Sequence, residues 1–461
     1  MSSETDYENL APLLDGWQIV PLKSIVSKLV DGSHNPPSKK ETGRPMLSAR
    51  NIENNNILFD DFRYISDEDF DREHARTRVE AGDVLLTIVG TIGRSAVVLS
   101  GMNGFTLQRS VAVLKPSGVL PKYLMYQFQA PFIQHHFEKN ARGTAQKGVY
   151  LKTLGQTPIR VAPLSQQKRI VAEIEKQFSR LDEGINNLKR VKVNLKRYKA
   201  AVLKAAVEGK LVETEAEIAR RENRKYETGE QLLQRILETR RSQWTGKGKY
   251  KEPAAADTTD LPELPEGWVW ATADQLMALI TDGEHITPQR SDSGVLLLSA
   301  RNVLNGRLDF TQVDYIPEEE HQRICKRLTI TEGDVLLSCS GSVGRSCVVP
   351  HGVKFSLVRS VAVLRPAGIS SEFVCYQIQS PLLQSQIKSR QTQTAQANIF
   401  QGKIRQLVFP LPPEAEQHRI VAEVDRRLSL LRGTEIQVDV NLKRAERLRQ
   451  SILQSAFRGD S

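Results

Sequence analysis

The sequence predicts an α+β protein with two mixed α/β globular domains joined by two long antiparallel coiled-coil helices, in a pseudo-twofold tandem repeat. Three observations lead to this prediction. An eight-residue motif at 167–174 is repeated almost unchanged at 417–424. Each copy opens a long stretch without proline, in which apolar residues recur at alternating steps of four and three. Further motifs ahead of the two copies are repeated at nearly the same offset.

The two copies of this motif are Gln-Lys-Arg-Ile-Val-Ala-Glu-Ile and Gln-His-Arg-Ile-Val-Ala-Glu-Val. Prolines stand just before them, where a helix start tolerates proline. The apolar rows that follow are typical of a coiled coil, and we call each row a seam. The first seam is Ile174, Phe178, Leu181, Ile185, Leu188, Val191, Leu195, Tyr198 and Val202. The second is Val424, Leu428, Leu431, Val438, Ala445, Leu448, Ile452 and Ala456, interrupted by Glu435 and Asn441. The simpler alternative is two unrelated amphipathic helices, each packed on its own domain.

The globular parts repeat as well, at an offset of 250 or 251 residues. A constant offset over this distance indicates a tandem duplication of domain plus long helix. The matching motifs are Asp31-Gly-Ser-His34 with Asp282-Gly-Glu-His285, Ser48-Ala-Arg-Asn51 with Ser299-Ala-Arg-Asn302, Gly90-Thr-Ile-Gly-Arg-Ser95 with Gly341-Ser-Val-Gly-Arg-Ser346, and Arg109–Leu114 with Arg359–Leu364.

The repeat divides the chain into five parts: a first domain (1–163), a first long helix (164–211), a charged helical insertion with a linker (212–264), a second domain (265–412) and a second long helix (413–461). Residues 84–89, 96–99 and 110–114 predict short strands separated by glycine turns. Residues 121–137 predict a helix after them. The insertion has no counterpart after the second helix.

The 461 residues carry a formal net charge of +10, which favours a polyanionic partner. No run of 18 apolar residues occurs, and the first residues lack the apolar core of a signal peptide. The four cysteines (Cys325, Cys339, Cys347 and Cys375) form no CxxC pair. They indicate reduced thiols rather than a disulfide framework or zinc site, and we expect a cytoplasmic protein.

Nearly the whole chain resembles the specificity subunits of type I restriction–modification systems. The resemblance rests on two globular domains, each followed by a Gln-x-Arg-Ile-Val-Ala-Glu motif and a long helix. The helices end near Ala206-Val-Glu-Gly209 and Ala456-Phe-Arg-Gly459, which fill the family's final position. Any single piece of this pattern is weak, whereas the arrangement as a whole is specific.

The resemblance implies a non-catalytic subunit that binds double-stranded DNA. Each domain would be a target-recognition domain for half of a bipartite site, with the paired helices setting the distance between the halves. The helices would also dock two modification subunits, which carry the methyltransferase chemistry with S-adenosylmethionine. Restriction subunits, with ATP and Mg²⁺, add to that core. No cofactor or metal is expected in this chain itself.

Motifs for chemistry within the chain are incomplete. Asn35-Pro36-Pro37 matches amino-methyltransferases, but the next residue is Ser38 rather than an aromatic residue that stacks a flipped base. The glycine loop at 90–95 lacks the span and the lysine of a P-loop. Asp31-Gly32 is first of all a turn signature. We therefore expect no catalytic residues.

The candidate DNA contacts are polar loop residues that mostly recur in both domains. Arginine suits guanine edges and asparagine suits adenine edges. Recurrence can instead reflect fold maintenance, for example a side chain bonded to a turn carbonyl. The candidates are Arg50, Asn51, Arg94, Arg109, Arg142, Thr144, Gln146 and Lys147 in the first domain, and Arg301, Asn302, Arg345, Arg359, Arg390, Thr394 and Gln396 in the second. The alternative function is a coiled-coil interaction scaffold without sequence-specific DNA readout.

Overall fold

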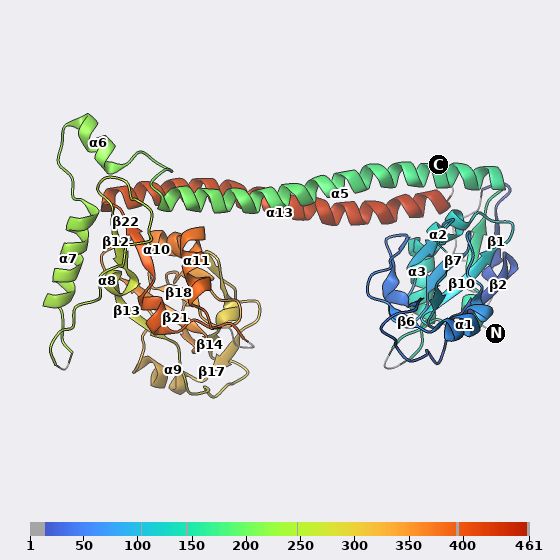
Figure 1. Ribbon diagram of the computed structural model, residues 1–461, viewed down its shortest axis with the longest axis horizontal. Helices are drawn as coiled ribbons and strands as arrows, with labels where there is room; N and C mark the ends of the chain where they lie inside the picture. Colours follow the sequence, from blue (N-terminus) through green and yellow to red (C-terminus); the bar gives the residue numbers. More distant parts are fainter. Residues whose placement is uncertain (1–13, 103, 144–145, 247, 393–395, 459–461) are drawn as a thin grey trace. The chain divides into compact units, whose positions relative to one another are not determined.

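The computed structural model describes residues 14–102, 104–143, 146–246, 248–392 and 396–458, in two compact units (Figure 1). The first unit comprises the described parts of Met1–Arg190 and Val438–Ser461, and the second is Val191–Gln437. The division falls inside both long helices. Each unit therefore contains one globular domain, the start of one long helix and the end of the other.

The first domain alternates short strands with helices up to the first long helix. Its elements are β1 (Gln18–Pro21), η1 (Leu22–Ser24), β2 (Val26–Asp31), β3 (Arg44–Leu47), η2 (Ala49–Asn51), β4 (Ile52–Glu53), β5 (Asn56–Ile57), β6 (Arg63–Ile65), α1 (Asp67–Thr77), β7 (Val84–Thr87), β8 (Ser95–Val97), β9 (Thr106–Leu107), β10 (Val111–Pro116), α2 (Pro121–Gln129), α3 (Pro131–Asn140), α4 (Leu151–Leu154), β11 (Pro158–Val161) and α5 (Leu164–Val207).

The rest of the chain repeats this order after two helices of the insertion. Its elements are α6 (Glu215–Glu222), α7 (Gly229–Ser242), β12 (Val269–Thr272), α8 (Ala273–Leu276), β13 (Met277–Asp282), β14 (Val295–Leu298), η3 (Ala300–Asn302), β15 (Val303–Leu304), β16 (Arg307–Leu308), β17 (Asp314–Ile316), α9 (Glu318–Cys325), β18 (Val335–Ser338), β19 (Ser346–Val348), β20 (Phe355–Leu357), β21 (Val361–Pro366), α10 (Ser371–Gln379), α11 (Pro381–Arg390), α12 (Gln401–Arg405), β22 (Val408–Leu411) and α13 (Glu414–Arg458).

A four-stranded sheet forms the centre of each domain, in the order β2-β10-β7-β8 and again β13-β21-β18-β19. β10 is antiparallel to both neighbours, so Val113 lies opposite Val30 on one side and Leu85 on the other. Because side chains alternate along a strand, neighbouring residues of β7 face different clusters. Leu86 packs with α2 and α3, and Leu85 packs with β3 and β9. Both faces of the sheet are therefore buried.

Smaller sheets complete each domain. In the first they are β6-β3-β9, with β3 and β9 parallel, together with the pairs β1-β11 and β4-β5. The second domain repeats them as β17-β14-β20, β12-β22 and β15-β16. The identical strand orders confirm the predicted tandem repeat of mixed α/β domains.

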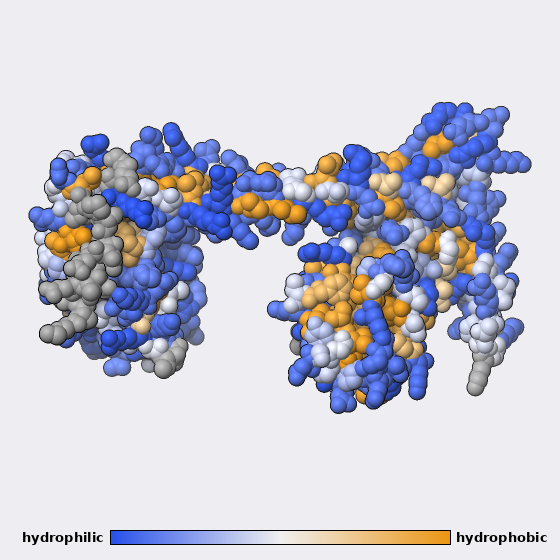
Figure 2. Space-filling view, turned by 180° about the vertical axis from the view of Figure 1, so that it is seen from behind, coloured by the Kyte–Doolittle hydropathy of each residue, from blue (hydrophilic) through white to orange (hydrophobic). Residues whose placement is uncertain are grey.

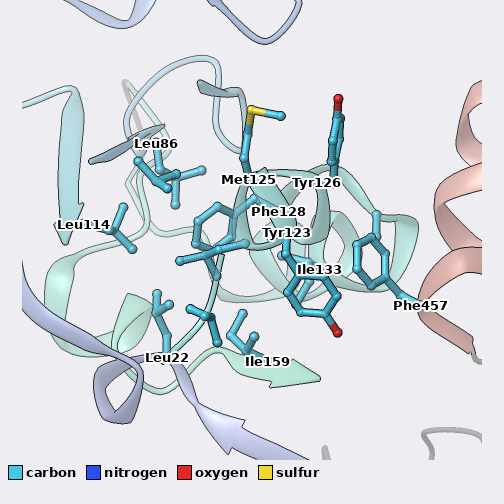
Figure 3. Packing of buried hydrophobic residues seen from close by; sticks show 14 of the residues in the cluster. Leu22, Leu86, Leu114, Tyr123, Met125, Tyr126, Phe128, Ile133, Ile159 and Phe457 are labelled. Atoms are coloured by element: carbon cyan, nitrogen blue, oxygen red, sulfur yellow. The ribbon is translucent and has the colours of Figure 1, made fainter. Parts of the chain in front are cut away.

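The helix predicted at 121–137 is two helices in the structure. Ala130 between α2 and α3 is extended, with φ −67° and ψ 142°. The ring of Pro131 disfavours a helical conformation in the residue before it, which explains the break. Figure 3 shows Tyr123 and Phe128 of α2 packing into the core, with Phe457 of α13 beside Tyr123.

The two long helices pair within each unit. In the first unit, the start of α5 packs on the end of α13: Phe178 and Leu453 are buried in the same cluster. Arg449 hydrogen-bonds to Asp182, and its guanidinium lies 4.2 Å from the centre of the Phe178 ring. In the second unit, the end of α5 shares a cluster with the start of α13, through Val202 and Val424. Within each unit the N-terminal part of one long helix packs on the C-terminal part of the other, so the predicted antiparallel pairing is confirmed.

The seam departs from the prediction at three positions. Val191, Tyr198 and Leu448 are exposed by 40–49%. The half-buried positions next to two of them are Lys199 and Arg449. An α-helix has 3.6 residues per turn, so a strict 3.5-residue seam drifts around it, and the next residue reaches the interface. Burial lowers the pKa of Lys199, which the charge of Glu435 opposes.

The insertion is part of the second domain. Leu232, Leu233 and Ile236 of α7 are buried in the core of that domain. Arg240, near the end of α7, donates to the backbone carbonyls of Asp274 and Gln275. The sequence predicted only a charged helical insertion, and these contacts make α7 a structural element of the domain.

Each domain is tied to the helix that follows it by a tryptophan. Trp17 donates to Gln166 at 2.7 Å, and Trp268 donates to Glu416 at 3.1 Å. The second oxygen of Glu416 accepts the backbone N–H of Glu215, at the start of α6. Glu416 is fully buried, and this burial raises its pKa to about 6. A titratable carboxyl therefore joins the insertion, the second domain and α13.

Candidate nucleic-acid interface

Three loops of the first domain are joined by backbone hydrogen bonds into one surface, which we call loop cluster 1: residues 31–34, 108–110 and 142–150, of which 144–145 lie outside the described residues. The N–H of Arg109 donates to Ser33 at 2.9 Å. Ile88, after β7, donates to Ser110 and accepts from Val149, both at 2.9 Å. The cluster is thus built on the end of the central sheet, a rigid support for side chains that contact a ligand.

The second domain builds the same surface, loop cluster 2: residues 282–285, 358–360 and 392–400, of which 393–395 lie outside the described residues. Arg359 donates through its N–H to Glu284 at 3.0 Å. Cys339, after β18, donates to Ser360 at 2.7 Å and accepts from Ile399 at 3.0 Å. The backbone scaffold therefore recurs with the sequence motif.

Glycine is required at the first loop of each cluster. A Cβ on Gly32 would lie 2.2 Å from the carbonyl oxygen of Leu107, and one on Gly283 would lie 2.4 Å from that of Val358. No L side chain fits so close to backbone. The Asp-Gly motif thus lets one loop lie directly against the next, in addition to forming a turn.

The histidine of each Asp-Gly-x-His motif is held at the edge of its cluster by the aspartate. His34 lies 2.8 Å from Asp31, and His285 lies 3.0 Å from Asp282. The two imidazoles remain more than half exposed. They are oriented and accessible, which suits a hydrogen bond to an incoming ligand.

Four cations of the two clusters are exposed and have no carboxylate partner within the described part of the chain: Arg109, Arg142, Lys147 and Arg359. Gln146 and Gln396 are exposed beside them. Their charges are therefore not balanced by a carboxylate of the described residues. A polyanion that binds there supplies the missing counter-charges.

The second cluster surrounds a cavity of about 430 Å³. Its polar lining comes from all three loops and includes Asp282, His285, Arg359 and Gln396, and Phe400 closes one side. Cys339 also lines it, but burial raises the pKa of this thiol to about 12. The thiol therefore stays protonated at neutral pH and is not an activated nucleophile.

Asn51 and Asn302 correct the prediction that their amides face DNA. Both are buried, at 1% and 2% exposure. The Asn51 amide donates to Leu58 and Asp60, and its oxygen accepts the N–H of Ser48. Asn302 makes the equivalent bonds in the second domain. These side chains hold their own loops, which is the fold-maintenance alternative, and we remove them from the candidate contacts.

Other candidates lie apart from the two loop clusters. Arg50 pairs with Asp61 at 2.6 Å, and Arg301 pairs with Asp314 at 3.0 Å. Both ion pairs are exposed, so the cations remain accessible to a phosphate. Arg94 lies 3.9 Å from Glu53.

Arg94 also lines a cavity with Arg449 and Gln450 of α13, which places it beside the long helix. Its counterpart Arg345 is half-buried. Arg390 lines a different cavity, with Asp257 and Asp260 of the linker. Thr144 and Thr394 lie outside the described residues. The structure thus brings together only part of the predicted set.

Two residues of the clusters were missed by the sequence analysis: Tyr150 and Phe400. They occupy matching positions, 250 residues apart, and both are exposed. The available signal was the recurrence of an aromatic residue in an otherwise polar loop. Aromatic rings carry neither the charge nor the amide group that marked the predicted contacts, so this pair was not among them.

The described ranges hold neither a candidate metal centre nor a membrane-spanning helix. Within them, no group of three His, Cys, Asp or Glu side chains could hold a metal ion. Among the same residues, no helix combines the length and the apolar character needed to cross a membrane. Figure 2 shows that hydrophilic residues cover most of the visible surface of the first domain.

The duplicated α/β domains, each with a loop cluster that presents an exposed arginine at the same position and with the paired long helices, define a two-domain protein with two matching polar surfaces. The family model of the type I restriction modification DNA specificity domain matches residues 15–191 and 299–437. This is more than half of the chain, which therefore belongs to that family.

Three curated relatives from Escherichia coli are specificity subunits of type I restriction enzymes. The EcoBI subunit is 24% identical over 331 residues, which cover 70% of this chain and 62% of the relative. The EcoAI subunit is 21% identical over 479 residues, covering 90% and 77%. The EcoKI subunit of strain K12 is 29% identical over 208 residues, covering 43% and 44%. The match thus spans less than two thirds of the EcoBI subunit.

A solved structure shares the fold. It comes from work on complex assembly and conformational transition of the type I R-M system. The comparison gives a TM-score of 0.64 at 20% identity and covers 98% of this chain and 100% of the other. The likeness supports the two-domain fold with long helices.

Proposed function

We propose that this chain is the DNA-specificity subunit of a type I restriction–modification complex. Each domain contacts one half of a bipartite DNA site through its loop cluster. The observation that carries the proposal is the repeated loop scaffold, with the exposed, unpaired Arg109 and Arg359 at the same position of its two copies and with Arg142 and Lys147 adding charge in the first. Cations on a rigid sheet end contact phosphates or guanine edges, and the repeat supplies two such surfaces.

The chemistry belongs to partners in this proposal. Two modification subunits dock on the paired helices and transfer methyl groups from S-adenosylmethionine. Restriction subunits add ATP- and Mg²⁺-dependent cleavage.

The test is a methylation map and a binding curve. The chain alone should bind DNA with a steep salt dependence and transfer no methyl groups. Together with its modification subunit and S-adenosylmethionine, it should direct adenine methylation to both strands of one bipartite sequence. Arg109→Ala should reduce the slope of log affinity against log salt by about 1 if the side chain contacts one phosphate.

Two results would oppose the proposal. Methyl transfer by the highly purified chain alone would make it an enzyme. A chain that assembles with its partners but binds random and specific DNA equally poorly would instead be the interaction scaffold considered as the alternative. The Trp244→Ala variant, which changes an exposed residue of the insertion, is the matched control and should leave the salt slope unchanged.

A further inference from the structure

Exposed apolar side chains recur at three pairs of matching positions in the described part of the chain: Phe59 with Phe310, Tyr150 with Phe400, and Tyr198 with Leu448. Single exposed apolar residues are normal on a protein surface. The other exposed large apolar residues of the described chain have no such counterpart, so recurrence at these positions is a stronger observation. At these positions both copies of the fold expose an apolar side chain.

Two of the pairs lie away from the loop clusters. The Phe59 ring makes edge contacts with Phe62 and Phe105, at 6.4 and 5.7 Å between ring centres, so it packs within its own domain. Tyr198 and Leu448 lie on the long helices. Tyr150 and Phe400 remain. They are 59% and 63% exposed, and within the described residues neither ring has an aromatic partner.

Both residues also break a local rule of helix formation. Tyr150 is the N-cap of α4 and Phe400 is the N-cap of α12, and neither provides a side-chain cap. Ser, Thr, Asp and Asn are strongly preferred at this position because their oxygens accept a free N–H of the first turn. Because Tyr150 and Phe400 have no side-chain oxygen in that place, α4 and α12 both lack the capping hydrogen bond. Such violations are expected at functional sites.

The surroundings of the two rings indicate the ligand. Each ring follows a buried residue that bonds to the end of the central sheet: Val149 to Ile88, and Ile399 to Cys339. Phe400 lines the same cavity as Arg359. Its neighbour Gln401 hydrogen-bonds to Asp282, which fixes the loop against the Asp-Gly-x-His motif. An aromatic ring on a fixed loop that shares a cavity with an unpaired arginine, as Phe400 does with Arg359, matches a nucleotide, which offers phosphate together with an apolar base edge. Tyr150 occupies the equivalent position on the scaffold that carries Arg109.

We propose that Tyr150 and Phe400 are specificity-determining DNA contacts, one for each half-site, and that each packs its ring on the apolar edge of a nucleotide. This inference rests on the proposed function. The contacting surface is the methyl group of a thymine, a base edge that only some sequences present. Arg109 and Arg359 position the backbone beside the ring, and the ring contributes the preference among sequences.

The experiment compares Tyr150→Ala and Phe400→Ala in the assembled complex, with Tyr150→Phe and Trp244→Ala as controls. Affinity is measured on the cognate site, on sites with one half scrambled, and on random DNA. Tyr150→Ala should lower cognate affinity on the order of 10-fold and leave random DNA unchanged. It should make the complex indifferent to scrambling of the first half-site only. Phe400→Ala should do the same for the second half-site.

The control variants should bind like the wild type, because Tyr150→Phe keeps the ring and Trp244 lies in the insertion. Replacing the thymines of one half-site by deoxyuridine removes the methyl groups: a loss that matches the alanine variant supports the inference, and no loss would overturn it, because a contact to the sugar does not discriminate sequences. Wild-type discrimination by both alanine variants would overturn the inference while leaving the proposed function intact. Absence of specific binding by the wild-type complex would overturn the proposed function itself.

Discussion

The proposed role of the paired helices can be tested by lengthening both by one heptad. Tandem duplication of 182–188 in α5 and of 443–449 in α13 places the insertions at the same height, because Asp182 and Arg449 contact each other in the first unit. Each duplicated segment then faces the other, and the Asp182–Arg449 contact is repeated. A full heptad keeps the seam in phase apart from about 20° of drift.

The insertion adds about 10 Å of helix at 1.5 Å per residue. This corresponds to about three base pairs at 3.4 Å each. DNA twists once in 10–10.5 base pairs, so one half-site would have to rotate on the order of 100° to meet its domain. If the helices set the separation, the variant should lose activity on the original site. Any activity it regains should favour a spacer longer by about two to four base pairs.

The assay is a genome-wide methylation map with the modification subunit supplied. A variant with the duplication in α5 alone is the control: its helices no longer match, and it should be inactive on every spacer. Full activity of the doubly lengthened protein on the unchanged spacer would refute the idea that the helices determine half-site separation.

Three more perturbations have defined outcomes. Phe457→Ala removes a fully buried ring that packs on Tyr123 and should lower the free energy of unfolding by about 3–5 kcal/mol in chemical denaturation; a loss below about 1 kcal/mol would contradict this packing. Glu416 has a folded pKa of about 6, above its ordinary 4.5, so its contribution to stability is greatest below pH 4.5 and is lost as the pH rises through 6. From pH 4.5 to 7.5 the wild type should therefore lose up to about 2 kcal/mol relative to Glu416→Gln, whereas a constant difference in unfolding free energy would argue against the shift. Replacing residues 142–149 by the equivalent loop of a relative should change recognition of one half-site only, as seen by methylation mapping, and an equal change in both would contradict the division of labour between domains.

The sequence was sufficient for the features that depend on periodicity. Ile174, Phe178 and Val202 were assigned to the seam and are buried. The motif repeat anticipated two copies of one strand order. These properties follow from local spacing and from a constant offset, which are visible in a single chain.

Side-chain roles within a motif were less accessible. Asn51 and Arg109 both recur, yet the first is buried and bonded to carbonyls seven and nine residues away, while the second is exposed and unpaired. The difference arises from tertiary contacts that no residue pattern encodes. Likewise, a charged composition hid the burial of Leu232 and Ile236, because one narrow apolar stripe is enough to dock a helix.

The location of Phe457 has a consequence for biosynthesis. Its carbonyl accepts a hydrogen bond from Arg160, 297 residues earlier in the chain. During translation the first domain leaves the ribosome with Tyr123 uncovered, and that face stays open while the whole second domain is made. Apolar surface exposed for so long invites chaperones or aggregation. The duplicated architecture thus delays completion of its first half until its second half exists, which ties the abundance of the folded protein to uninterrupted synthesis.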